Sequence, residues 1–383
     1  MRVRRTPLTA IVTAALSAVL LTAATTVGVA AAQPAAAAQP ASSNGRASVP
    51  WHRVGAGWVL TQYASAAPDG GSGPAVLFLI SPGGTRYQLA RWPNWRFAPQ
   101  LLAWSPEGQR ALFQVFSGNG GTEVLTLATG QLSTFVMPGA ASPIGFTTPR
   151  GLNIVADQPA GSGTSLARYS LSGQLLQPLG YSADGQVLYA PSGIEFLTGT
   201  SHGLKLVSNG GALIRNLPVS GTSANSCNPV RWWSSGTVLA SCLPPNSGIP
   251  QLWLVPVSGA RPAALTPPRR VSSGDLGDLD AWPLPSGLYL QSAGPCAVLQ
   301  IFRQARNGSI SLVTVPNTNG DNRVLTALGS RLLIQAPTSC AGSVSLLWFN
   351  PATRAEQWLI RAPGNVAGAS IAIPFYSREN GNL

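Results

Sequence analysis

The chain has 383 residues, 45% of them hydrophobic, and a formal net charge of +12. Such a chain can bury a large core, so the composition excludes a wholly disordered protein. Two histidines in the whole sequence exclude a metal centre built from several histidines, and no nucleic-acid recognition motif accompanies the positive charge.

Residues 1–32 resemble an export signal. Three arginines at positions 2, 4 and 5 precede an uncharged apolar run, and Ala30-Ala31-Ala32 offers small residues for cleavage before Gln33. We therefore predict a signal peptide over 1–32, with Ala36-Ala37-Ala38 as a second candidate site. The alternative is an uncleaved anchor, because the run from Leu8 to Ala32 is long enough to span a bilayer.

Residues 33–50 are rich in Ala, Pro and Ser and predict a disordered linker. We expect a protein secreted outside the cell, associated with a membrane only if the leader stays uncleaved. Loss of the three leader arginines would leave a net charge of +9, which suits an anionic cell-envelope polymer and equally suits simple solubility.

Three strands are predicted after the linker, over 58–63, 76–81 and 86–90. A first strand for this group is missing. The carboxyl-terminal run Ala369 to Phe375 has no group of its own, so we expect it to supply that strand, with Trp51 to Val54 as the competing candidate.

The stretch from Leu101 to Val136 contains four apolar runs separated by three turn signals. Ser105-Pro106-Glu107-Gly108 separates the first two runs, glycines at 118–121 the next two, and Thr129-Gly130 the last two. Proline presets φ for a turn, and glycine supplies the positive φ that a residue with a Cβ resists. This pattern predicts one four-stranded antiparallel sheet.

The same unit recurs seven times along the chain. The glycine that ends the first turn returns at steps of 51, 43, 42, 43, 51 and 42 residues, at Gly57, Gly108, Gly151, Gly193, Gly236, Gly287 and Gly329. The glycine of the third turn runs in phase at Gly84, Gly130, Gly173, Gly211, Gly259 and Gly308, with Asn350-Pro351-Ala352-Thr353 in the seventh slot. Four strands at this period are typical of a β-propeller blade.

The later blades are predicted over 144–179, 186–217, 228–265, 279–315 and 323–360, and no sustained helical periodicity follows the leader. The fold class is therefore all-β. We predict a seven-bladed β-propeller of four-stranded antiparallel sheets over residues 51–383, closed by the C-terminal strand.

The Trp104-Ser105-Pro106-Glu107-Gly108 turn followed by Ala111-Leu112-Phe113 resembles the repeat of TolB-like and WD40-like β-propellers. Looser copies occur at Ser182-Ala183-Asp184-Gly185 and Trp233-Ser234-Ser235-Gly236. The resemblance implies the propeller fold and a tendency to bind partners, and it assigns no catalytic residue.

Four cysteines in an exported chain favour structural disulfides over metal binding or catalysis. A hairpin that turns at Ser234-Ser235 places Cys227 directly opposite Cys242. Cys296 and Cys340 stand 44 residues apart at matching places in neighbouring repeats, and we predict a second bond that joins blades six and seven.

Candidate ligand-binding residues fall in loops that a propeller gathers on one face. They are Arg91, Trp92, Trp95 and Arg96 between blades one and two, His202 in blade four, and Asp275, Asp278 and Asp280 before blade six. The tryptophans and arginines are suited to stacking on a sugar or an aromatic ligand, or else to packing between blades. The three acids suit Ca²⁺ or form a solvated loop.

No motif selects a catalytic residue, a metal site or a cofactor. Gly161-Ser162-Gly163-Thr164-Ser165 lacks the glycine spacing of a nucleophile elbow, and the twelve acids are scattered over the repeats. We expect a monomeric, non-catalytic recognition or scaffolding module for a protein or an anionic cell-envelope polymer. The alternative is a propeller-fold hydrolase or lyase that acts on an extracellular carbohydrate or peptide.

Overall fold

The computed structural model describes residues 45–66, 72–116, 121–147, 149–160, 163–180, 187–219, 226–244, 249–266, 277–293, 298–305, 307–337, 343–361 and 365–371. All of them belong to the unit that spans Ala38–Leu383. The predicted signal peptide and the linker up to residue 44 lie outside these ranges. No helix within them has the length and apolar character needed to cross a membrane.

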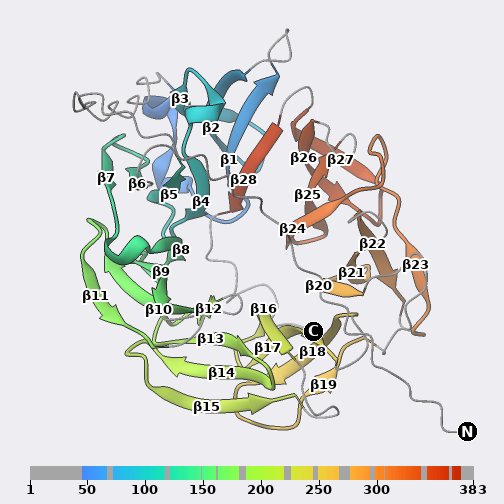
Figure 1. Ribbon diagram of the computed structural model, residues 1–383. Coiled ribbons are helices and arrows are strands. Elements are labelled where there is room, and N and C mark those ends of the chain that lie inside the picture. The colour runs from blue at the N-terminus through green and yellow to red at the C-terminus, as the bar shows by residue number, and fades with distance from the viewer. Residues whose placement is uncertain are drawn as a thin grey trace, which may run out of the picture. The chain divides into compact units, whose positions relative to one another are not determined.

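The described chain is built from antiparallel strands (Figure 1). The first sheet contains β1 (Val59–Ala66), β2 (Ser72–Ile80), β3 (Arg86–Trp92) and β28 (Asn365–Ile371). The second contains β4 (Gln100–Trp104), β5 (Arg110–Val115), β6 (Gly121–Thr126) and β7 (Leu132–Phe135). The third contains β8 (Ser142–Phe146), β9 (Asn153–Ala160), β10 (Gly163–Ser170) and β11 (Leu175–Pro178).

The next eight strands form one sheet with two halves. One half is β12 (Val187–Tyr189), β13 (Glu195–Thr200), β14 (Gly203–Ser208) and β15 (Leu213–Pro218). The other half is β16 (Ser226–Ser234), β17 (Thr237–Leu243), β18 (Gln251–Pro256) and β19 (Ala263–Ala264). The halves join where Thr200 pairs with Cys227 and Gly203 with Ser226.

Two four-stranded sheets complete the described chain. One contains β20 (Asp278–Leu284), β21 (Gly287–Ala293), β22 (Leu299–Gln304) and β23 (Ile310–Leu312). The other contains β24 (Arg323–Leu328), β25 (Arg331–Pro337), β26 (Val344–Asn350) and β27 (Ala355–Ile360). The helices of the described residues are four short 3₁₀ turns, η1 (Arg46–Ser48), η2 (Trp51–Arg53), η3 (Trp95–Phe97) and η4 (Pro138–Ala140). The expectation of almost pure β structure is confirmed over these ranges.

The strand β28 lies beside β1, in the same sheet as the first three strands of the chain (Figure 1). The predicted run was Ala369 to Phe375, whereas the strand spans Asn365–Ile371 and residues 372–383 lie outside the described ranges. The competing candidate was wrong, because Trp51–Arg53 forms the 3₁₀ turn η2. Residues distant by about the whole chain therefore meet in one sheet.

Each four-stranded unit is covered by apolar side chains on both of its faces. In β5, Ala111 and Phe113 belong to a cluster shared with the first sheet, and Leu112 between them belongs to a cluster shared with the third. Side chains alternate between the faces of a strand, so a strand with both faces covered reads as a continuous apolar run. This packing explains why the runs in the sequence do not alternate with polar residues.

The segment 45–54 packs on the first two sheets. Residues 45–50, the last six of the predicted linker, are therefore ordered. Val49 is buried in the cluster shared by these sheets, and the Arg46 Nη2 donates a 2.6 Å hydrogen bond to the Leu89 carbonyl oxygen. Trp51 and Val54 pack against the same cluster. The ordered domain therefore begins before residue 51, the boundary predicted from the sequence.

The recurring glycines adopt left-handed backbone conformations at the turns. Twelve of the thirteen glycines in the two series have positive φ, between 57° and 139°, and Gly236 is the exception. In the seventh slot of the second series, Arg354 takes the same conformation with φ 61°. A residue with a Cβ is strained there, which is why the period is carried by glycine.

A β-bulge recurs in the first strand of five of the units. The pairing of the first strand with the second skips a residue between Leu101 and Ala103 in β4, and at the matching places in β8, β16, β24 and β28. A bulge redirects the side chains that follow it and often lies near functional residues. The first strands of these five units are therefore bent at the same level, whereas β20 has its bulge nearer the start of the strand, between Asp278 and Asp280.

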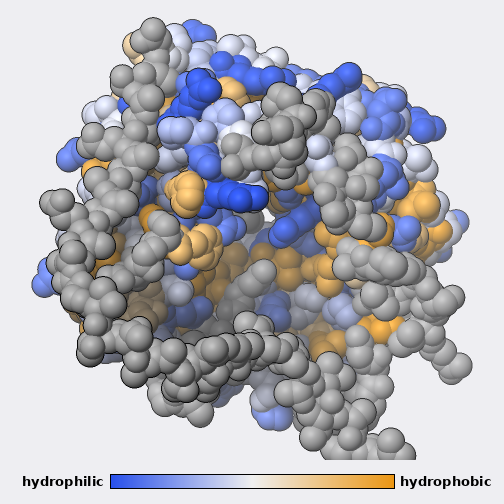
Figure 2. Space-filling view, turned by 45° about the horizontal axis from the view of Figure 1, so that its top comes forward, coloured by the Kyte–Doolittle hydropathy of each residue, from blue (hydrophilic) through white to orange (hydrophobic). Residues whose placement is uncertain are grey.

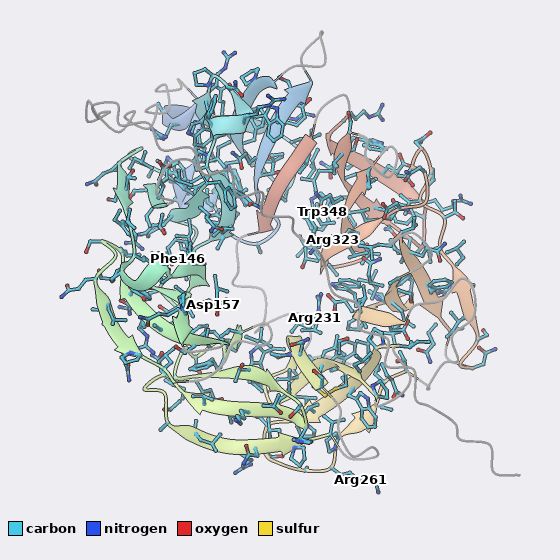
Figure 3. All side chains as sticks on the ribbon, viewed as in Figure 1. Phe146, Asp157, Arg231, Arg261, Arg323 and Trp348 are labelled. Atoms are coloured by element: carbon cyan, nitrogen blue, oxygen red, sulfur yellow. A yellow bond between two sulfur atoms is a disulfide. The ribbon has the colours of Figure 1, made fainter. Side chains whose placement is uncertain are left out.

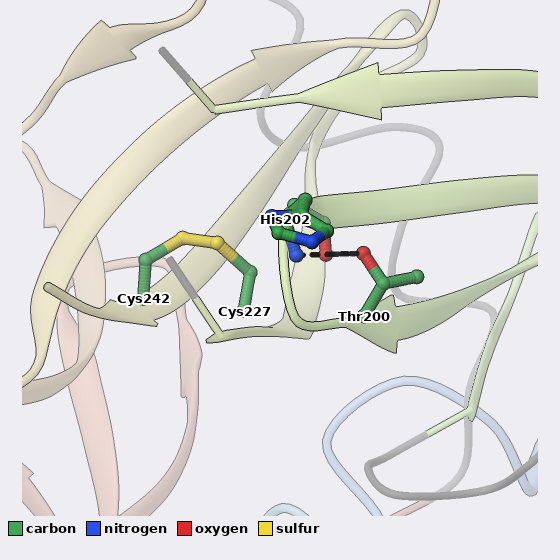
Figure 4. Close-up of a disulfide and its surroundings, with 5 residues drawn as sticks. Thr200, His202, Cys227 and Cys242 are labelled. Atoms are coloured by element: carbon green, nitrogen blue, oxygen red, sulfur yellow. Dashed lines mark hydrogen bonds between the residues drawn. A yellow bond between two sulfur atoms is a disulfide. The ribbon is translucent and has the colours of Figure 1, made fainter. Parts of the chain in front are cut away.

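Cys227 and Cys242 lie directly opposite each other in β16 and β17 and form a disulfide (Figure 4). This confirms the pairing predicted from the hairpin. Both cysteines are buried in a cluster shared by the two halves of the eight-stranded sheet. Cys296 and Cys340 lie outside the described residues.

We predict that Gly308→Ala lowers the free energy of unfolding by about 1 kcal/mol, because Gly308 has φ 81° and no atom would contact the added methyl group. Gly236→Ala is the matched control, since its methyl group is also uncontacted and its φ is not positive. Urea unfolding of both variants measures the difference. Equal effects of the two substitutions would contradict the strain argument.

We also predict that replacing Cys227 and Cys242 together by alanine lowers the free energy of unfolding by about 3 kcal/mol, from the entropy of the 15-residue loop that the bond closes. Non-reducing proteolysis and mass spectrometry of the wild type should recover the peptides of these cysteines as one cross-linked species. Recovery of two separately alkylated peptides would show that the bond does not form.

Candidate binding face

The starts of three first strands are held by glutamine side chains of the preceding sheet. Gln62 of β1 donates through Nε2 to the Pro99 carbonyl oxygen at 2.8 Å and accepts from the Leu101 N–H at 3.1 Å. Gln291 of β21 donates to the Asn322 carbonyl oxygen at 2.9 Å and accepts from the Val324 N–H at 2.6 Å. Each glutamine thus holds the start of the next sheet's first strand.

A third glutamine completes the series. Gln335 of β25 donates to the Val366 carbonyl oxygen of β28 at 2.9 Å, which ties the last sheet to the first. Sequence reasoning missed these three glutamines. A repeated motif could have revealed them, because each glutamine ends a mostly apolar run, at Val59-Leu60-Thr61-Gln62, Leu288-Tyr289-Leu290-Gln291 and Leu332-Leu333-Ile334-Gln335. We use the term entry face for the side of the molecule on which these first strands begin.

Trp92 packs between the first two sheets and is not accessible to a ligand. It is 3% exposed in the cluster between the first and second sheets, and its ring centroid lies 5.7 Å from that of Phe113 in an edge-on arrangement. Of the two readings of the tryptophan pair, the structure supports packing for Trp92.

Trp95 lies in η3, between the first and second sheets, and is 47% exposed. The side chain of Asn94 caps this turn by accepting a hydrogen bond from the Arg96 N–H at 2.9 Å. Arg91 at the end of β3 and Arg96 in the turn are both exposed. The predicted tryptophan and both arginines are therefore accessible on one short segment.

Two exposed aromatic residues that the sequence reasoning missed lie beside Trp95. Phe97 is 71% exposed and Phe116 is 68% exposed. Gln100 pairs with Gln114 in β4 and β5, so the chain just before β4 lies across from Phe116. We name Trp95, Phe97 and Phe116 the aromatic patch. A solvated aromatic group three side chains wide is unusual for packing and typical of a binding surface.

A buried carboxyl group lies in β6, the strand that pairs with β5. Glu123 of β6 pairs directly with Phe113, is 2% exposed, and its Oε2 has no hydrogen-bond partner among the described residues. Burial raises the pKa of this carboxyl above its ordinary value of 4.5. A neutral acid is the form that such surroundings favour.

The acids before the sixth unit do not share a site. Asp278 is 1% exposed and its Oδ1 accepts a 2.6 Å hydrogen bond from the Ser292 hydroxyl. Asp280 binds Arg231 of β16, whose Nε donates to Oδ1 at 2.8 Å while Nη2 donates to Oδ2. The bulge between Asp278 and Asp280 separates the two side chains, which an unbroken strand would place on the same face.

No metal site is present in the part of the chain that the structure describes, since no three His, Cys, Asp or Glu side chains gather there. Asp275 lies outside the described residues. The calcium alternative therefore finds no support from Asp278 and Asp280, because each carboxylate has a protein partner.

Arg231 and Arg323 are charged residues of first strands that the sequence reasoning missed. The guanidinium carbon of Arg231 lies 4.5 Å from the centroid of the Trp282 ring. Arg323 begins β24 and is exposed. Burial raises the pKa of Asp280, and the charges of Arg231 and, more weakly, Arg323 oppose this rise. Figure 3 shows Arg231 and Arg323 at the inner sides of two sheets that flank the sheet of β20 to β23.

His202 lies in the exposed turn between β13 and β14, close to the disulfide (Figure 4). Its backbone N–H donates to the Thr200 hydroxyl at 3.2 Å. Both ion pairs among the described residues involve arginine, so His202 has no carboxylate partner there. The structure thus keeps the predicted residues in three separate places and does not assemble them around one reacting atom.

The view of Figure 2 shows hydrophilic and hydrophobic residues side by side around a hollow in the surface. A cavity of about 320 Å³ lies elsewhere, lined by residues of β15, β18 and the turn that contains Arg261. It contains none of the predicted residues.

The sequence matches no family model and no curated protein. Among solved structures, the chain is similar to a puromycin-hydrolyzing peptidase of Mycobacterium tuberculosis, with 14% identity and a TM-score of 0.55 over 80% of this chain and 52% of the peptidase. A prolyl endopeptidase gives 13% identity and a TM-score of 0.53 over 77% and 47%. TolB from Acinetobacter baumannii gives 13% identity and a TM-score of 0.44 over 82% and 66%.

These likenesses show the fold alone. The fold is β-propeller-like, with antiparallel four-stranded sheets. The chain spans about half the length of the peptidases that it matches.

We predict that Glu123→Gln gains stability over the wild type as the pH rises. The native state holds the Glu123 proton more tightly than the unfolded chain, so the carboxyl contributes most below pH 4.5, and this contribution is lost as the pH rises through the raised pKa. Chemical unfolding at pH 4 and pH 7 measures the difference between variant and wild type. Asp157→Asn should change in the same direction, because burial also raises the pKa of Asp157. A difference that does not grow with pH would contradict the prediction.

Proposed function

We propose that the protein is a secreted recognition module built on a closed seven-bladed β-propeller, and that it binds its partner through the aromatic patch with Arg91 and Arg96. The blade count is supported by the seven four-stranded units, counting each half of the eight-stranded sheet as one. Closure is supported by β28 beside β1 and by the apolar cluster that the last sheet shares with the first. The disulfide supports an oxidising compartment.

The observation that carries the proposal is the exposure of Trp95, Phe97 and Phe116 beside two exposed arginines. Large aromatic side chains contribute strongly to binding because they bury much surface at a low entropic cost. The backbone that carries Trp95 and Phe97 is the capped turn η3, and Phe116 directly follows β5, so all three residues are attached to ordered elements. The arginines favour a partner with negative charge, such as an anionic cell-envelope polymer or an acidic protein surface.

A hydrolase or lyase is the second candidate, because the similar solved structures include peptidases. The described residues offer little for this reading. Asp278 and Asp280 are engaged with Ser292 and Arg231, and His202 has no carboxylate beside it within the described ranges. Binding without chemistry therefore fits the described geometry better.

We predict that Trp95→Ala with Phe97→Ala weakens binding of the full chain to purified cell-envelope fragments roughly tenfold, as expected for loss of two aromatic anchors. Cosedimentation measures the affinity. Ile310→Ala with Leu312→Ala is the matched control, because these exposed side chains lie on β23 away from the aromatic patch. Equal binding of both double variants, or no binding of the wild type, would contradict the proposed surface.

The same incubations separate the second candidate from the first. Soluble sugar or peptide fragments released by the wild type, and absent without protein, would establish the hydrolase or lyase. A bound fraction without released fragments supports recognition alone.

A further inference from the structure

The first strands of three successive units place two arginines and one carboxylate together. Arg231 lies on β16, Asp280 on β20 and Arg323 on β24 (Figure 3). Arg231 and Asp280 are 13% and 19% exposed at their side chains. Arg231 and Asp280 therefore form a partly desolvated pair at the inner side of the sheets, with the exposed Arg323 on the next first strand.

The carboxylate of Asp280 is already satisfied. Its Oδ1 accepts from the Arg231 Nε at 2.8 Å and from the Ala281 N–H at 2.7 Å, and its Oδ2 accepts from the Arg231 Nη2. Arg231 is held in this position from a second side by the face of Trp282. The paired guanidinium and carboxylate cancel each other's charge and are fixed in place.

Arg323 then remains as an uncompensated cation. Its side chain makes no hydrogen bond or ion pair with the described residues, and it is exposed at the start of β24. It lies near Asp280, because Asp280 pairs with Gln291, whose side chain bonds the Asn322 carbonyl oxygen and the Val324 N–H on either side of Arg323. The group of three carries a net charge of +1, with the donors of the Arg323 guanidinium unused.

We propose that Arg323, beside the Arg231–Asp280 pair, binds an oxyanion, a carboxylate or a phosphate group of a ligand that enters between the first strands. A guanidinium presents parallel N–H donors that match two oxygens of such a group. A surplus of positive charge at a protein surface raises the local concentration of anions. Asp280 limits the affinity, because its negative charge opposes the incoming anion.

This site is separate from the aromatic patch, which lies between the first and second sheets. It therefore does not depend on the proposed function. Loss of envelope binding on removal of the aromatic patch and loss of anion binding on removal of Arg323 are independent results.

The test is a titration of the full chain, labelled with ¹⁵N-arginine, with inorganic phosphate and with acetate at constant ionic strength. The Arg323 Nε signal is assigned by its disappearance in Arg323→Gln. We expect it to shift saturably with both anions and not with chloride. The exposed Arg261 is the internal control and should shift only weakly and without saturation.

Asp280→Asn gives the sharper result. Removal of one opposing charge should lower the Kd for phosphate about fivefold. If Asp280 only stabilised the fold, its replacement by asparagine would not tighten anion binding. Arg323→Lys keeps the charge without the planar fork and should weaken binding. An Arg323 signal that follows Arg261, or a Kd unchanged in both Asp280→Asn and Arg323→Lys, would overturn the proposal. Saturation by phosphate alone would restrict the ligand to phosphate groups.

Discussion

Burial of both faces of every four-stranded unit is the constraint on which the rest of the structure depends. A small antiparallel sheet with one covered face would bury too little apolar surface to be stable alone. Here each unit shares one apolar cluster with the unit before it and another with the unit after it, and the last unit shares one with the first. The stability of any unit is therefore tied to its neighbours, and β28 beside β1 extends this dependence across the chain termini.

This packing decides where polar chemistry can lie. Most side chains on the sheet faces belong to the apolar clusters, so a charged group on a face, such as Glu123 in β6 or Asp157 in β9, is partly or fully withdrawn from water. The glutamines show the cost of placing polar groups deeper: Gln62 and Gln291 are almost fully buried, and each has both ends of its amide hydrogen-bonded. Glu123 lacks such a partner for Oε2, and burial shifts its pKa instead.

Much of this fold was predictable from the sequence because its period is carried by turns, which are local. The four strands predicted between Leu101 and Val136 match β4 to β7 within two residues at each end, and the opposition of Cys227 and Cys242 followed from one hairpin. The site was less predictable. Burial of Trp92 and exposure of Trp95 are set by the neighbouring sheet, and the pairing of Arg231 with Asp280 joins residues 49 positions apart.

The bulges explain the largest difference between sequence and structure at the candidate site. The sequence placed Asp278 and Asp280 in a loop before the sixth unit, where they could share a ligand, whereas both lie in β20. The pairing of β20 with β21 skips a residue between them, so Asp278 turns toward Ser292 and Asp280 reaches Arg231, which itself follows a bulge in β16. Because a bulge recurs in five other first strands, it is a property of the repeat.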